Sequence, residues 1–357
     1  MSTLKTIKNI EWIEDLEREN TIFYISIYHE AYGPLLLKGT GFYFQHQLCL
    51  HDGRIGRYYK SKKEREKASA YFLELVKQKN PKIQQLYEQC KIYLKKEKEL
   101  IKKFSKINNE TIVKDYGKII SECKYIFMYL TNVPLLILSA LEGKESEFQI
   151  TIDLFQEFRK TSRIGFHELV LEKIWKAAKE YGRWKNYIDF SYFTTTELGN
   201  MFKNKEYPSK EEIEKRKKGC AFYKSFDKTQ IFFYENNFST KIRINLQDLK
   251  NLNEVKGISA YKGCVKGRVC IINRMNDMKK FQEGDVIISI NSNPSLMPVL
   301  SKCKGIVTNE GGLICHAAVI ARELNIPCII GTKVATRIFH DGDMVEVNAD
   351  KGIIKKI

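Results

Sequence analysis

The chain has 357 residues, of which 43% are hydrophobic, and a formal net charge of +17. This length and composition predict two domains with ordinary hydrophobic cores. The longest apolar run, Val133 to Leu141, is far shorter than the roughly 20 residues that a bilayer-spanning helix needs. The N-terminal segment also lacks an apolar signal core, so we expect a cytoplasmic protein that does not contact a membrane.

The cysteines argue against structural disulfides and zinc. All nine are scattered singly, with no CxxC pair and no Cys/His cluster at the spacing of a metal site. This pattern favours a reducing compartment, and no metal ligand is predicted.

The positive charge is concentrated in mixed runs before residue 257, such as Lys60–Lys67, Lys95–Lys103 and Lys210–Lys218. These runs alternate in sign at helical spacing, which is typical of solvated helix faces. No nucleic-acid-binding motif accompanies them, so nucleic acid is not an expected partner. An acidic partner protein or a phosphorylated ligand remains compatible with the charge.

The first part of the chain is predicted to be mostly α-helical. Glu11–Asn20 fits a short amphipathic start, and Thr21–Leu50 fits irregular turns around its glycines. Apolar periodicity predicts longer helices over residues 61–79, 81–104, 110–141 and 146–181. The inward-facing candidates on these helices are Tyr71, Phe72, Leu75, Leu86, Tyr93, Leu94, Phe148, Ile152, Phe155 and Phe158.

Two helix starts and a hairpin follow. Threonines precede Glu197 as a helix N-cap, and Pro208-Ser209 precedes a second helix. Residues 229–244 are predicted to form a hairpin that turns at Asn236-Asn237. The predicted organisation is therefore a helical domain at 1–228, a hairpin and linker at 229–256, and a further domain at 257–357.

After Gly257 the pattern changes to short β-runs with Gly-rich turns, which predicts a mixed β/α domain and an α+β multidomain protein overall. The predicted strands are Val265–Ile272, Asp285–Ile290, Gly305–Thr308, Pro327–Gly331 and Met344–Asn348, and the predicted helices are Pro294–Ser301 and His316–Leu324.

One histidine in this domain has an unusual setting. His316 follows a Gly-Gly turn closely and begins an amphipathic helix that ends before Pro327. Glycines let the backbone approach an anion, and the first N–H groups of a helix bind one. The positive end of the helix dipole also favours neutral, nucleophilic imidazole. We interpret His316 as a covalent phosphoryl carrier. The simpler alternative is a capped helix with a half-buried histidine.

Residues 257–357 resemble the mobile phosphohistidine domain of the phosphoenolpyruvate-utilising enzymes. The resemblance rests on GISAYKGCVKGRVCII, EGDVIISINSNPSLMPVL, GIVTNEGGLICHAAVIARELNIPCIIGT and DGDMVEVNADKGIIKKI, in that order. The family includes phosphoenolpyruvate synthase, pyruvate phosphate dikinase and the rifampicin phosphotransferases, and its mobile domain is a swivelling β/α domain. From about residue 150, the preceding segment is more loosely similar to the corresponding part of such chains.

The resemblance and the residues together assign a phosphoryl site. His316 is the nucleophile, and Gly311 and Gly312 allow close backbone approach or simply form a tight turn. Thr308 either offers a hydroxyl to the same pocket or only ends a strand. The family pattern has Thr where this chain has Ile314, which removes a further hydroxyl.

Two flanking residues leave alternatives open. Cys315 is a small packing residue or an oxidation-sensitive thiol. Arg322 contacts the phosphoryl group or a partner active site, or forms a surface ion pair with Glu323 or Glu310. The other histidines are given no part in the site; they are His29, His46, His51, His167 and His340.

The family's ATP-grasp domain and phosphoenolpyruvate-binding barrel are not recognisable in the sequence, and no GxxxxGK[ST] motif occurs. We therefore expect a phosphotransferase subunit that carries phosphate on His316 and binds no cofactor itself. A separate ATP-grasp chain would hold ATP and Mg²⁺. The acceptor would be pyruvate, with phosphoenolpyruvate as its phosphorylated form, or a small molecule held by the N-terminal helices. The alternative is a non-catalytic regulatory protein that uses the histidine domain as an interaction module.

Overall fold

The computed structural model describes residues 3–19, 21–53, 55–160, 164–181, 190–226, 228–233, 252–273, 275–292, 296–312 and 315–357. The chain divides into two units, Met1–Ile244 and Asn245–Ile357. Each unit has its own sheet and its own hydrophobic core, so the protein is an α+β multidomain chain.

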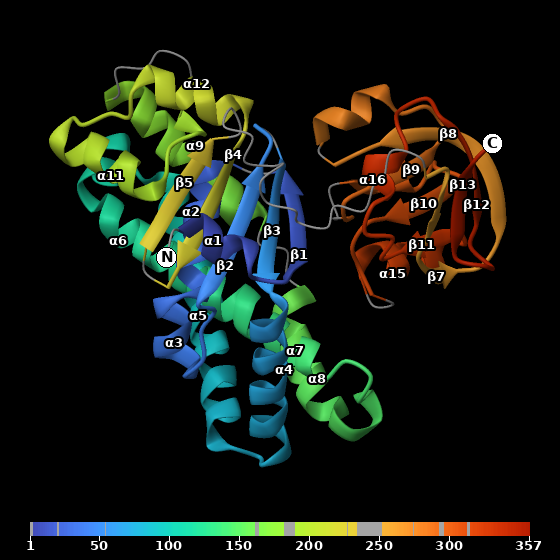
Figure 1. The fold of residues 1–357 in the computed structure, drawn as a ribbon, viewed down its shortest axis with the longest axis horizontal. Coiled ribbons are helices and arrows are strands. Elements are labelled where there is room, and N and C mark those ends of the chain that lie inside the picture. The colour runs from blue at the N-terminus through green and yellow to red at the C-terminus, as the bar shows by residue number, and fades with distance from the viewer. Residues whose placement is uncertain are drawn as a thin grey trace. The chain divides into compact units, whose positions relative to one another are not determined.

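The first unit is built on an antiparallel sheet in the strand order β1-β3-β2-β4-β5. Alternating side chains on the strands face two different cores, as the pleat requires. In β2, Leu48 packs with Ile7 of α1, whereas Cys49 joins the helical core on the opposite face. Figure 1 shows this sheet among the helices of the first unit. The strands are β1 Trp12–Glu19, β2 His46–His51, β3 Ile55–Ser61, β4 Cys220–Ser225 and β5 Lys228–Phe233.

This sheet was not predicted from the sequence, and the helical start expected at Glu11–Asn20 is wrong. The segment forms β1 and pairs with β3, with an irregularity between Glu14 and Leu16. Its Glu and Arg residues favour a helix locally, but pairing to a distant strand overrides so weak a preference. Thr21–Leu50 is also more regular than expected, because it contains α2, α3 and β2.

The helices of the first unit bury one large core against the sheet. Of the predicted inward-facing side chains, Phe72, Leu86 and Phe155 are buried, whereas Tyr71 and Leu75 are only partly so. The helices are α1 Thr3–Lys8, α2 Ile22–Tyr32, α3 Pro34–Thr40, α4 Lys62–Lys77, α5 Pro81–Lys106, α6 Asn109–Phe127, the π-helix η1 Met128–Asn132, α7 Val133–Ala140, α8 Glu145–Lys160, α9 Ile164–Tyr181, α11 Thr195–Asn204 and α12 Lys210–Lys218.

By length and apolar composition, the helical stretch Asn109–Ala140 could cross a membrane. Only its C-terminal end overlaps the shorter apolar run Val133–Leu141 noted in the sequence. Of its most apolar window, 61% is buried within the protein. This is the pattern of a helix in a protein core, and it is the only such helix in the described ranges.

The predicted helix starts at Thr194 and Ser209 are present, whereas the predicted hairpin is paired differently. Residues 228–233 pair back onto β4, so the turn lies near Phe226 and not at Asn236-Asn237. Residues 234–251, which contain the expected turn, lie outside the described residues. The expected linker also ends in a strand, β6 Glu254–Lys256, which belongs to the second unit.

The second unit contains an eight-stranded mixed sheet in the order β6-β13-β12-β8-β9-β10-β11-β7. Strands β8 to β11 are parallel to one another, and the outer strands are antiparallel. The strands besides β6 are β7 Ile258–Tyr261, β8 Cys264–Ile271, β9 Val286–Ser289, β10 Gly305–Thr308, β11 Cys328–Ile330, β12 Met344–Asn348 and β13 Ile353–Lys356.

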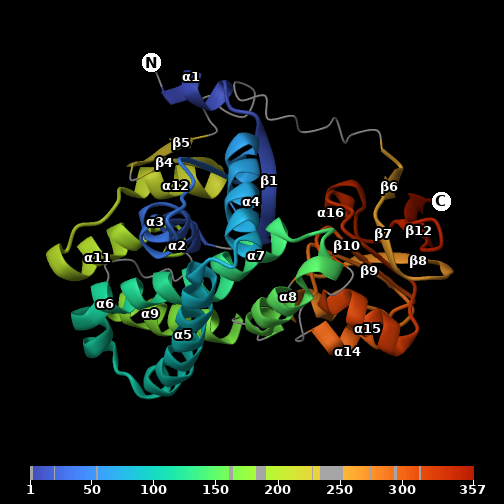
Figure 2. The ribbon, with the colours of Figure 1, turned by 90° about the horizontal axis from the view of Figure 1, so that it is seen from below.

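Two cores cover the faces of strands β8–β11. On one face lie α14 (Met297–Leu300) and α15 (His316–Leu324), and on the other lies α16 (Ala335–Ile338) (Figure 2). The 3-10 helix Met275–Lys280 precedes β9. All five predicted strands of this unit occur, whereas β6, β7, β13 and α16 were not predicted.

Candidate functional site

The parallel strands β8 to β11 end at the same edge of the sheet. The loops that leave this edge begin at Ile272, Ile290, Asn309 and Gly331. In open α/β sheets, ligands bind outside the carboxyl ends of the parallel strands. This edge is therefore where the fold concentrates polar groups that could act on a ligand.

Two asparagines hold these loops together. Oδ1 of Asn273 accepts a hydrogen bond from the backbone N–H of Ile290, 2.8 Å away, and so links the loops after β8 and β9. Oδ1 of Asn309 accepts from the backbone N–H of Thr336 at 3.1 Å, and its Nδ2 donates to the Thr336 hydroxyl at 2.6 Å. The loops are thus tied by side-chain amides, which gives the edge a defined geometry.

His316 lies at this edge, as the first residue of α15. Its Nδ1 lies 3.2 Å from Oγ of Ser292, which comes from the loop after β9. Its Nε2 has no hydrogen-bond partner among the described residues. Cys315, the N-cap residue, gives no side-chain cap to the helix, so the first N–H groups of α15 are not taken up by a capping side chain.

The charge state of His316 suits a nucleophile. Burial of the half-buried ring lowers the pKa of His316 below its ordinary value, and the negative charge of Glu323 only partly opposes this shift. Burial disfavours the charged form of an imidazole. At neutral pH the ring is therefore neutral and one ring nitrogen carries a lone pair.

Gly311 and Gly312 differ in what they do. Gly311 has φ +126°, and a Cβ there would lie 2.8 Å from Sγ of Cys315. A side chain at this position would be strained and would also clash. A Cβ on Gly312 would meet no atom of a described residue within 4 Å.

The remaining predicted site residues are positioned less directly. Thr308 is fully buried, and its hydroxyl donates to the Glu310 carbonyl oxygen at 2.6 Å, so it shapes the loop. Cys315 packs its thiol over Gly311 and donates its backbone N–H to Gly312. Arg322 is exposed and forms no ion pair with a described residue. Ile314 lies outside the described residues.

Sequence reasoning missed Ser292, Asn273 and Asn309. Each of them lies one to three residues after the end of β8, β9 or β10. The predicted ends of these strands could therefore have located them. Among the other histidines, His29 is buried, His46 contacts the Tyr223 hydroxyl and His340 is exposed. The side chain of His167 lies outside the described residues.

Comparison with known proteins identifies this unit. Residues 281–352 match the family model described as the PEP-utilising enzyme, mobile domain. The second unit is therefore similar to the mobile domain of the PEP-utilising enzymes. The matched range contains the loops after β9 and β10, and with them His316 and Ser292.

Curated relatives match about a quarter of the chain. It is 41% identical over 88 residues to a probable phosphoenolpyruvate synthase of Archaeoglobus fulgidus, which covers 25% of this chain and 12% of that protein. It is 46% identical over 86 residues to phosphoenolpyruvate synthase of Pseudomonas aeruginosa, covering 24% of this chain and 11% of the relative. The chain thus matches only about an eighth of the length of such relatives.

One solved structure, of an Enzyme I protein, aligns with 77% of this chain and 79% of its own at 18% identity. Its TM-score of 0.21 is too low to bear on the fold.

Proposed function

We propose that the second unit is a phosphoryl carrier and that Nε2 of His316 holds the phosphoryl group. The observation that carries the proposal is the contact between Nδ1 of His316 and the Ser292 hydroxyl, which leaves Nε2 without a partner among the described residues. With the proton on Nδ1 donated to Ser292, the lone pair lies on Nε2. The similarity to phosphoenolpyruvate synthases supports phosphotransfer as the class of reaction.

Two transfers make up the proposed reaction. In the first, the Nε2 lone pair forms an N–P bond while the P–O bond of the donor breaks, and the leaving oxygen keeps its electron pair. In the second, an oxygen of the acceptor forms a P–O bond while the N–P bond breaks and returns the pair to Nε2. Covalent catalysis of this kind replaces one difficult transfer by two easier ones.

The neighbouring backbone would bind the phosphoryl oxygens. The uncapped N-terminus of α15 and the loop at Gly311 and Gly312 present N–H groups where an anion would lie. Arg322, six residues further along, is available to a phosphoryl oxygen or to a partner. Thr308 and Cys315 would act only by shaping this loop.

We further propose that donor and acceptor sites lie outside the second unit. The donor would be ATP with Mg²⁺ on an ATP-grasp chain, and the acceptor would be pyruvate or another small molecule. What supports a separate donor site is that only 11–12% of the matched synthases corresponds to this chain. In this scheme the chain itself holds no cofactor.

Labelling tests the carrier. Tagged protein in a lysate of its own host is supplied with ATP labelled at the β or the γ phosphate, or with labelled phosphoenolpyruvate, and is recovered at alkaline pH. We expect acid-labile, alkali-stable label on the wild type and none on His316→Ala, with His340→Ala as the matched control that keeps its label. No label from any donor, with the protein folded, would leave a binding module and overturn the proposal.

A further inference from the structure

The first unit contains an open groove of about 680 Å³ between α6 and α11, helices that lie next to each other in its helical core. Small-molecule sites in proteins have volumes of about 300–1,000 Å³. The groove lies entirely within the first unit and shares no residue with the candidate site around His316. It is therefore a separate feature that needs its own explanation.

The charged side chains that line the groove are all cationic. Lys114 and Lys124 come from α6 and Lys203 from α11, and no Asp or Glu of the described residues lines the groove. Lys124 pairs with Glu30 of α2, whereas the other two lysines form no ion pair with a described residue. Two unpaired ammonium groups beside one concave surface favour a ligand with negative charge.

A buried hydroxyl lies beneath the lining at the start of α11. Thr195 is 3% exposed, and its Oγ1 has no hydrogen-bond partner among the described residues. Its backbone is already engaged, because the N–H donates to the Ser26 hydroxyl and the carbonyl accepts from the Tyr116 hydroxyl at 2.8 Å. Because Oγ1 itself is buried from solvent, a ligand in the groove does not reach it, and the preference for negative charge comes from the two lysines.

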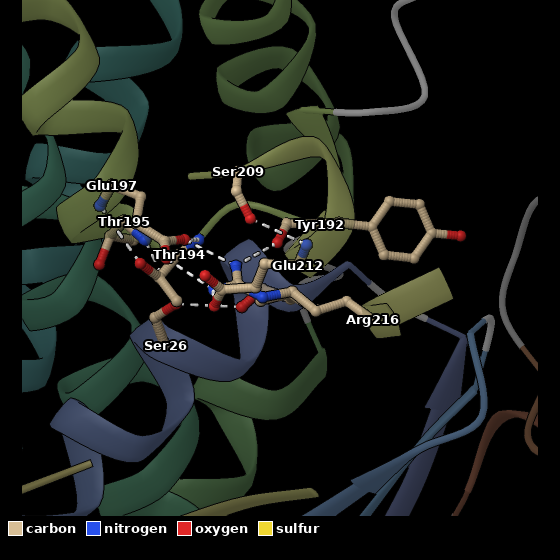
Figure 3. A network of polar contacts seen from close by, with 9 residues as sticks. Ser26, Tyr192, Thr194, Thr195, Glu197, Ser209, Glu212 and Arg216 are labelled. Carbon is tan, nitrogen blue, oxygen red and sulfur yellow. Dashed lines mark hydrogen bonds and ion pairs between the residues drawn. The ribbon is translucent and has the colours of Figure 1, made fainter. Parts of the chain in front are cut away.

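The helix that carries Thr195 is held rigidly at this end. Glu197 and the fully buried Arg216 form a bidentate ion pair, with N···O distances of 2.7 and 2.6 Å. Arg216 also donates to the Tyr192 carbonyl oxygen at 2.7 Å and contacts Glu212. Figure 3 shows Thr194, Thr195 and Glu197 within this one network. The groove is therefore preformed on its α11 side.

The uncharged lining fits an apolar body. Ile120 and Phe202 contribute apolar surface. Gly117 and Gly199 have no side chains, so they leave room between the two helices. A Cβ on Gly117 would meet no atom within 4 Å in the part of the chain that the structure describes. A Cβ on Gly199 would lie 3.3 Å from the ring of Tyr116.

We propose that this groove binds a small phosphate monoester with a ring or other apolar body. Its dianion would pair with Lys114 and Lys203, and its body would lie over Gly117. The inference does not depend on phosphorylation of His316.

Calorimetric titration of the full chain with phenyl phosphate tests the proposal. We expect saturable binding, with weaker binding of benzoate, which carries one charge, and none of benzyl alcohol, which carries no charge. The double variant Lys114→Gln/Lys203→Gln should bind phenyl phosphate at least about tenfold more weakly, since hydrogen bonds to charged groups contribute about 1.5–3 kcal/mol. Its matched control is Lys98→Gln/Lys102→Gln on α5, which removes the same charge from exposed positions outside the groove.

Two further variants separate binding from folding. Gly117→Leu should abolish binding while thermal stability stays equal or rises, because its Cβ meets nothing and leucine favours a helix. Thr195→Val should change neither binding nor stability, since the lost hydroxyl is buried and had no partner among the described residues. His316→Ala should bind phenyl phosphate as the wild type does, so failure of this proposal and failure of the phosphoryl carrier are distinguishable.

Three results would overturn the assignment: no saturable binding of phenyl phosphate, equal weakening in the control pair, or benzoate or benzyl alcohol binding at least as tightly as phenyl phosphate.

Discussion

Oγ of Ser292 lies 3.2 Å from Nδ1 of His316, although the two residues are 24 positions apart in the chain. Each follows one of two adjacent parallel strands, β9 and β10, and the parallel pairing brings their loops together. A hydrogen bond at one ring nitrogen fixes which nitrogen remains free to react. Ser292 is thus a positioning residue for the proposed nucleophile.

Ser292→Ala should slow phosphorylation of His316 about tenfold, which corresponds to the loss of one hydrogen bond of about 1–1.5 kcal/mol. The ring would then sample both tautomers and more orientations. The measurement is the initial rate of label incorporation. Ser292→Thr should restore the rate, and the exposed control Ser301→Ala should leave it unchanged. An undiminished rate in Ser292→Ala would show that the contact has no part in positioning.

The rate of His316 phosphorylation should be constant above about pH 7 and should fall in acid. Burial lowers the pKa of His316, so the reactive neutral ring is still present somewhat below pH 6.5 and is lost only as pH falls through the lowered pKa. The measurement is label incorporation against pH under single-turnover conditions. A midpoint above 6.5 would contradict the effect of burial.

Gly311→Ala should destabilise the second unit by about 1–3 kcal/mol, the usual cost of strained backbone. Its φ of +126° disfavours any side chain, and the new Cβ would lie 2.8 Å from Cys315 Sγ. Gly312→Ala is the matched control, because its φ is not in the left-handed region and no atom of a described residue lies within 4 Å of its Cβ position. Chemical denaturation of both variants checks the difference, and equal stability of the two would count against the loop geometry.

Glu197→Gln should lower the free energy of unfolding of the first unit by about 3 kcal/mol, because it leaves the buried charge of Arg216 with less compensation. Glu211→Gln, which removes only the exposed pair with Lys215, should cause no measurable change. Urea denaturation compares them. Similar effects for both carboxylates would mean that burial of Arg216 does not matter.

The first unit should lose stability as pH falls from 6.5 to about 3. Burial, with the nearby charges of Lys224 and Lys60, lowers the pKa of His29 to about 3. Between this pH and 6.5 the unfolded chain binds a proton that the folded chain does not, which opposes folding by at most about 5 kcal/mol. His29→Leu should flatten the unfolding free energy over this range. If the unfolding free energy of His29→Leu depends on pH as steeply as that of the wild type, the prediction is wrong.

The sequence by itself determined the local features of the second unit. His316 after its glycines, the start of α15 and the five main strands follow from turn residues and short-range apolar patterns, which depend only on neighbours in the chain. The family resemblance depends on the same local pieces, so it too could be read directly.

Only the tertiary structure decided what depends on distant pairing. The strand at Trp12–Glu19 forms because β3 pairs with it, and Ser292 reaches His316 because two parallel strands end side by side. The groove between α6 and α11 likewise joins residues about 80 positions apart, such as Tyr116 and Thr195. Hydrogen bonds between separate elements do not produce a periodic pattern in either segment. The sequence therefore predicts the individual elements, and only the fold shows which of them are in contact.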